Sequence, residues 1–378
     1  MKKFIKTIIT LIIFILLTTM PAYAITDERD KEFMDQQYDV IDSAGLTREL
    51  PEETRELLES LGIENIEFNE VYNLSFTKVF SLLKSLVTGE LNSPIKFMAI
   101  MVGVIILLSV ADALLPQSSH EAARLVCSLF FIISVVGAVI SYSSYLVSAI
   151  QTSCNFMLGF IPVFTAVVSV SGNPASAISY NTLAMAIAQG ASAFTSTFLL
   201  PLTSMFIVLS IASSVSPNLN IDGMAQMLKK TVIVVLTALS TVFTGFLSLK
   251  GILASSVDTV ALKSGKFLIN SAIPIIGSSL SEGLSSIVGS MSMLKNAVGV
   301  FGIIAVVIIN VPALIQALLW MCSISLTAFA AEAMGQKDAA KLLRNLNAAN
   351  VILITVMIFV MILIIISIAL ILVFKASL

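Results

Sequence analysis

The segment KSGKFLINSAIPIIGSSLSEGLSSIVGSMSMLKNAVGV, residues 263–300, is rich in glycine and serine within a very apolar chain. From Leu280 onward, apolar residues recur at the spacing of one helix face, and small or polar residues fall on the opposite face. In a membrane helix such a polar face lines water or lets another helix approach closely, and an ionisable group on it is a functional hypothesis. The candidate polar pathway or subunit-contact face comprises Ser278, Glu282, Ser285, Gly289, Ser292, Lys295 and Asn296.

The composition of the whole chain agrees with a membrane location. Of 378 residues, 57% are hydrophobic and 12% are charged, and the mean hydropathy is +0.99. These values are too apolar for an ordinary soluble protein and predict an all-α polytopic membrane protein in contact with the lipid bilayer. Residues 25–94 differ, because they carry 16 acidic against 6 basic side chains.

The N-terminus resembles a secretory signal. Residues 1–24 combine three lysines, a short apolar run and Ala22-Tyr23-Ala24, which predicts a cleaved signal peptide. An uncleaved first transmembrane helix is the alternative. Either reading makes residues 25–94 an acidic extracytoplasmic helical region, with a helix start at Pro51-Glu52-Glu53. About 70 residues bury only a small core, so this region is expected to pack on the membrane body or on a partner.

Apolar segments follow one another from residue 95 to the C-terminus. Pro162 and Pro274 interrupt the two shortest, at 154–170 and 267–277, and are candidate broken-helix positions in re-entrant segments. The expected segments are 95–115, 125–150, 154–170, 181–198, 199–216, 231–249, 267–277, 297–325 and 347–374.

An internal repeat organises these segments. Leu108-Ser109-Val110-Ala111 recurs as Leu209-Ser210-Ile211-Ala212, and Ile161-Pro162 with Gly190 recurs as Ile273-Pro274 with Gly302. We interpret this as two parallel helical repeats, 95–198 and 199–311, followed by a partial third, 312–378, that contains a C-terminal transmembrane helix. Chance similarity between apolar segments is the alternative.

The two copies have diverged. The first has a break at Gly172-Asn173-Pro174. Only the second keeps a continuous polar-faced helix, which favours it as a specialised surface.

Motifs for catalysis and for ligand binding are missing from the sequence. It has no phosphate-binding G-x-x-x-x-G-K-[ST], no G-x-S-x-G and no H-E-x-x-H. Cys127, Cys154 and Cys322 are far apart in apolar surroundings, and there is a single histidine, so no metal site or cofactor is predicted. The sequence has no basic patch interleaved with aromatic residues, so nucleic acid is not a predicted partner. The chain is therefore not expected to be an enzyme.

The motifs Ile273-Pro274-Ile275-Ile276-Gly277 and Leu294-Lys295-Asn296-Ala297-Val298-Gly299, with a serine-rich acidic step between them, resemble the stage III sporulation protein AE family of endospore-forming Firmicutes. The resemblance extends over nearly the whole chain. It implies a multi-pass protein of the mother-cell membrane around the forespore, in a secretion-like channel complex. It also implies partners, namely other membrane and ring-forming subunits and a secretion-type ATPase, and no known catalytic residues. The alternative from the residues alone is a stand-alone secondary transporter or permease.

Overall fold

The computed structural model describes residues 50–63, 76–114, 117–215, 255–264 and 277–373, together with single positions between 223 and 267. Within these residues the secondary structure is helical, without strands, which confirms the predicted all-α fold. The signal peptide predicted at residues 1–24 lies outside the described residues.

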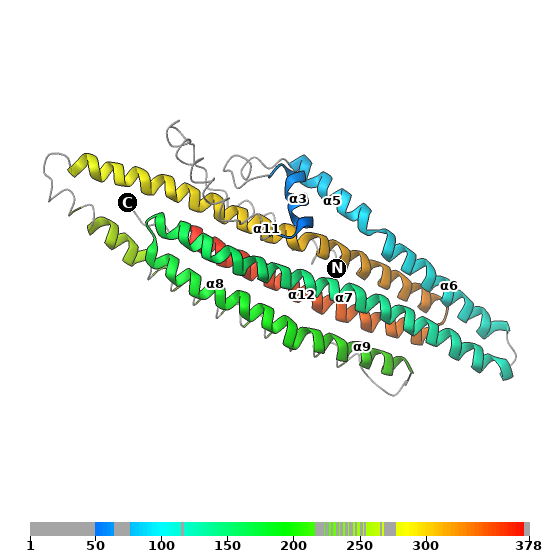
Figure 1. Ribbon diagram of the computed structural model, residues 1–378. Coiled ribbons are helices and arrows are strands. Elements are labelled where there is room, and N and C mark those ends of the chain that lie inside the picture. The colour runs from blue at the N-terminus through cyan, green and yellow to red at the C-terminus, as the bar shows by residue number, and fades with distance from the viewer. Residues whose placement is uncertain are drawn as a thin grey trace.

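Two helices of the acidic region pack on the bundle (Figure 1). Helix α3 (Glu52–Leu61) begins directly after Pro51 with two glutamates in its first turn, where acidic side chains favour a helix N-terminus. It buries Leu58 and Leu61 and ends at Gly62 with φ +86°. Helix α5 is Phe76–Glu90. Both α3 and α5 contact the long helix α11, so this region packs on the membrane body, as expected.

The bundle itself is built from long apolar helices. Helix α6 (Asn92–Leu114) leads into α7 (Gln117–Val170), and α8 (Pro174–Phe194) continues through the π-helical turn η1 (Thr195–Leu199) into α9 (Leu200–Val215). Helices α11 (Gly277–Ala333) and α12 (Lys337–Val373) complete it.

The core lies where α7, α11 and α12 run side by side (Figure 1). Helices α3, α5 and α6 lie against α11, whereas α8 and α9 lie against α7 and α12. Because hydrocarbon does not drive apolar helices together, close steric packing must hold this core. Gly299 of α11 lies under Leu372 of α12, and Gly302 lies under the ring of Phe160 of α7.

Five helical stretches are long and apolar enough to cross a membrane, counted over the part of the chain that the structure describes. They are Thr77–Leu114, Val126–Val170, Pro174–Leu209, Met291–Ala333 and Lys337–Ala369. At 1.5 Å per residue, α11 is about 85 Å long, against a hydrocarbon core of about 30 Å. Much of α11 must therefore extend beyond the hydrocarbon, which leaves apolar helix surface for α3 and α5 to cover.

The predicted break at Pro162 is wrong. Helix α7 passes through Pro162 without interruption, so the expected segments 125–150 and 154–170 are one helix. Proline removes one backbone donor, yet α7 continues through the exposed Pro162 as α11 continues through the buried Pro312, because surrounding groups in a helix bundle can satisfy the backbone carbonyl that a proline frees. Pro274 lies outside the described residues.

The predicted repeat boundaries fall within helices. Residues 94 and 95 lie in the first turn of α6, residues 198 and 199 lie in η1, and residues 311 and 312 lie in the middle of α11. The segments 181–198 and 199–216 accordingly join through η1. Most of residues 216–276 lies outside the described part, so the two-repeat interpretation stays a prediction.

Candidate functional site

All seven residues of the candidate polar face belong to α11, and those whose burial is described differ in how deeply they are buried. The backbone of Ser278, Glu282 and Ser285 lies in the first turns of the helix. Gly289 and Ser292 are half-buried, whereas Lys295 and Asn296 are buried. The predicted face therefore begins near the N-terminus of α11 and reaches the core at Lys295 and Asn296.

From Leu294 to Val306, each residue of α11 is buried. Both faces of the helix are covered there by α7 and α12. Where neighbouring helices surround a helix, its polar face is buried together with its apolar face. Of the predicted face, Gly289 and Ser292 keep partial exposure, whereas Lys295 and Asn296 are buried.

A buried carboxylate holds the junction between α7 and α8. Asp258, on the helical segment 255–264, is 1% exposed. Its Oδ1 accepts a hydrogen bond from the backbone N–H of Ala175 at 2.8 Å. Its Oδ2 accepts from the Ser176 N–H at 3.0 Å and from the Ser176 hydroxyl at 2.7 Å. Asp258 thus caps the N-terminus of α8 from 83 residues away along the chain.

The local sequence explains why α8 needs this distant cap. The first residue of α8 is Pro174, and Asn173 at the N-cap position makes no side-chain cap bond. Its amide donates instead to the carbonyl of Ser171 at 2.8 Å. The first free N–H groups of a helix need acceptors, and a carboxylate there also complements the helix dipole. Asp258 meets both needs.

Gly172 makes the turn between α7 and α8, where the sequence predicted a break. Its φ of +81° is a conformation that residues with a side chain rarely adopt. An added Cβ would also lie 3.1 Å from Val288 of α11 and 3.3 Å from Leu262. The turn is therefore packed between α11 and the segment that carries Asp258.

A second polar cluster surrounds residues 316–320 of α11. We call these residues, together with the polar side chains of the neighbouring helices around them, the polar section. The indole of Trp320 stacks on the ring of Tyr142 of α7, with 5.2 Å between ring centroids. Gln316 donates to the Glu90 carboxylate at the end of α5 over 3.0 Å. Asn350 of α12 donates to the Ala317 carbonyl at 3.2 Å. Side chains from α5, α7, α11 and α12 therefore meet within about one turn of α11.

Three polar atoms of this polar section are buried and have no hydrogen-bond partner: Gln316 Oε1, Trp320 Nε1 and Asn350 Oδ1. The buried hydroxyls of Tyr142 and Ser143 lie within hydrogen-bonding reach of each other. A buried polar atom left dry costs about 1–3 kcal/mol. Three such atoms would together cost about 3–9 kcal/mol, a large part of the stability of an ordinary domain, about 5–15 kcal/mol. The polar section therefore needs hydrogen-bonding partners beyond the side chains around it.

Polar side chains continue from the polar section toward the α11–α12 turn. Asn347 donates to the Ser325 hydroxyl at 2.9 Å, and Asn345 is buried. Beyond them Arg344 pairs with Glu332, and Gln336 donates to Asp112 of α6 at 2.6 Å.

In the other direction, Asn310 joins α11 to α7. Its amide donates to the Ser153 hydroxyl and to the Val306 carbonyl, each at 2.7 Å. Both side chains are buried, at 1% and 0% exposed. Such a contact fixes the register of two apolar helices that would otherwise slide with little penalty.

Replacing Asn310 with leucine is expected to destabilise the bundle by about 1 kcal/mol, because interhelical hydrogen bonds in membranes have about that value. The measurement is the free energy of unfolding from SDS titration of the purified chain, with Ser153→Ala and the double variant alongside. Since the two side chains share one bond, the double variant should lose less than the two single losses added together. Strict additivity would contradict this pairing.

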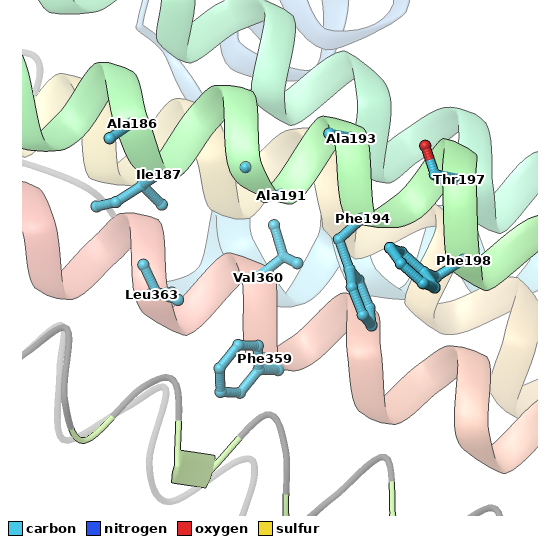
Figure 2. Close-up of a pocket in the computed structure, with 11 residues that line it drawn as sticks. Ala186, Ile187, Ala191, Ala193, Phe194, Thr197, Phe198, Phe359, Val360 and Leu363 are labelled. Atoms are coloured by element: carbon cyan, nitrogen blue, oxygen red, sulfur yellow. The ribbon is translucent and has the colours of Figure 1, made fainter.

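An apolar cavity of about 500 Å³ opens between α8, η1 and α12 (Figure 2). Phe194 and Phe198 form one side and Phe359 and Val360 of α12 the other (Figure 2). Apart from Thr197, its lining side chains are hydrocarbon. The cavity therefore offers almost no group for orienting a polar ligand or for catalysis.

The sequence missed most of these polar contacts. No pattern in the sequence around Asp258 indicates that it caps a helix. The run Asn345-Leu346-Asn347-Ala348-Ala349-Asn350 was a usable signal, because three amides within six residues are costly in a membrane helix. No sequence pattern indicates that Glu90 and Gln316, which are 226 residues apart, form a hydrogen bond. Among the described residues, no three His, Cys, Asp or Glu side chains gather as a metal site would require.

Long apolar helices that bury amides, hydroxyls and a capping carboxylate define a multi-pass integral membrane protein. The chain belongs to the stage III sporulation protein AE family, which it matches over residues 58–374. It is similar to stage III sporulation protein AE of Bacillus subtilis (strain 168), with 25% identity over 211 residues, or 54% of this chain and 53% of that protein. The match thus spans about half the length of this curated relative. No solved structure matches the chain.

Proposed function

We propose that the chain is a non-enzymatic membrane subunit of the complex that connects mother cell and forespore, and that forespore development needs it. The observation that carries this proposal is the family match over residues 58–374 on a chain with five membrane-length helices. The relative's name refers to a stage of sporulation and to no reaction.

The buried polar groups support a role in assembly and passage rather than in bond breaking. The carboxylate of Asp258 caps a helix, and the amide of Asn310 joins two helices. The hydroxyls beside them take part in the same helix contacts, since the Ser176 hydroxyl donates to Asp258 within the cap and the Ser153 hydroxyl accepts from Asn310 between helices.

The proposed location is the mother-cell membrane around the forespore, with the N-terminal region outside the cytoplasm after signal-peptide cleavage. The turn between α11 and α12 supports this orientation, because Lys337, Lys341 and Arg344 follow it directly. Short basic connections stay on the cytoplasmic side. The partners we propose are other membrane and ring-forming subunits and a secretion-type ATPase.

Deletion of this protein in its spore-forming host is expected to arrest forespores after engulfment, with early sporulation intact. The measurement is the count of heat-resistant spores, which should fall by orders of magnitude and return when the intact chain is restored in the mother cell. Normal numbers of heat-resistant spores from a clean deletion would refute the proposal.

Purification from sporulating cells tests the partners directly. A tagged chain should retain a secretion-type ATPase and ring-forming proteins that an equally tagged, unrelated multi-pass protein does not. Reconstitution of the chain alone in liposomes separates the alternative, since solute flux without partners would indicate a stand-alone transporter. Inert vesicles are the outcome expected of a subunit.

A further inference from the structure

The polar section around Trp320 is suited to a ligand that both donates and accepts hydrogen bonds. Trp320 Nε1 donates only, Gln316 Oε1 and Asn350 Oδ1 accept only, and the hydroxyls of Tyr142 and Ser143 do either. The Trp320, Gln316 and Asn350 atoms are buried without a partner, and the two hydroxyls lie within reach of each other. Water is the smallest molecule that satisfies both kinds of group at once.

We propose that the polar section is an internal water site between α5, α7, α11 and α12. A buried water makes about three hydrogen bonds and needs two to four polar partners, which this cluster supplies. The residues themselves are well covered, since Asn350 is 0% exposed, Tyr142 3%, Ser143 6% and Trp320 7%. Water here is therefore bound rather than part of the bulk solvent.

The edge of this water site is marked by Glu90. Its carboxylate accepts the hydrogen bond from Gln316, and Glu90 itself is only half-buried at the end of α5. A carboxyl group at the rim offers oxygen atoms to which water can hydrogen-bond. We place the entry for water at Glu90, on the side of the bundle that α3 and α5 cover.

This water site lies apart from the polar face that the sequence predicted on α11. Ser278–Asn296 occupies the first third of α11, whereas the polar section begins at Gln316, 20 residues after Asn296. At 1.5 Å per residue the two are about 30 Å apart along the helix, roughly one hydrocarbon thickness.

Trp320 is the only tryptophan in the chain, so its fluorescence reports on this site without a label. In the full-length protein in lipid nanodiscs, the emission maximum is expected at the longer wavelengths of a hydrogen-bonded indole. The lifetime should lengthen when H₂O is replaced by D₂O. Asn350→Leu, which removes two hydrogen-bonding groups, should shift emission to shorter wavelength and reduce the D₂O effect at least twofold.

The matched control is Ile354→Leu, one turn further along α12 and 4% exposed, which changes packing but no polar atom. It should leave emission and the D₂O effect as in the unmodified chain. If the unmodified chain shows the short-wavelength emission of a dry indole and no D₂O effect, the site holds no water and the proposal fails. Because that result comes from the unmodified chain, it does not depend on the folding of a variant.

Discussion

Replacement of Gly302 with alanine is expected to destabilise the protein by about 2 kcal/mol, because overpacking of a tight core costs about 1–3 kcal/mol. An added Cβ would lie 2.7 Å from Cε2 of Phe160, well inside van der Waals contact. The ring has no room to move, since Phe160 is 0% exposed and lies between Phe156 and Phe164, with ring centroids 5.6 and 5.2 Å away. The measurement is the free energy of unfolding by SDS titration in mixed micelles.

Gly289→Ala is the matched control, because it lies on the same helix and a Cβ there meets nothing within 4 Å. It should be neutral, or stabilise by up to about 1 kcal/mol through helix propensity. Phe160→Leu in the Gly302→Ala background should recover part of the loss, since it removes the clashing ring edge. A loss as large in Gly289→Ala would contradict the steric explanation.

Asp258→Ala is the second substitution with a large expected effect. It removes the acceptor of three hydrogen bonds at the start of α8 and leaves the buried Ser176 N–H and hydroxyl without a partner. Loss of a helix cap and of charged hydrogen bonds in a buried setting should cost about 2–4 kcal/mol. SDS titration measures this, and protease digestion should show earlier cleavage near the α7–α8 turn.

Two variants separate this capping role from a general effect of the region. Asp258→Asn keeps one acceptor oxygen and should fall between the unmodified chain and Asp258→Ala. Ser256→Ala changes an exposed hydroxyl on the same helical segment, whose only described bond is to Ile252 in that helix, and should be near neutral. Equal losses for Ser256→Ala and Asp258→Ala would rule out a specific cap.

The class of fold could be predicted because it follows from composition and periodicity. Long apolar runs form helices in a membrane, where each backbone group needs an internal hydrogen bond. The helix start at Pro51-Glu52-Glu53 and the break at Gly172-Asn173-Pro174 were also predictable, since they depend on the backbone preferences of a few adjacent residues.

The helix boundaries within the apolar body were less predictable. Pro162 reads as a break, yet α7 continues through it and α11 continues through the buried Pro312, so a proline in an apolar run does not by itself end a helix. Likewise, the segments on either side of residue 198 form one long helix through η1. Hydropathy alone does not distinguish two short apolar helices from one long one.

Residues 263–300 show which features could be predicted from the sequence and which required the tertiary structure. The sequence by itself determined that this stretch is helical from Leu280 onward and that the chain is a membrane protein of the stage III sporulation protein AE family. The tertiary structure alone decided that Lys295 and Asn296 are buried, that Asp258 caps α8, and that Gln316, Trp320, Tyr142 and Asn350 meet. The physical reason is distance along the chain: periodicity reports on residues three or four apart, whereas these contacts join residues separated by tens to hundreds of positions.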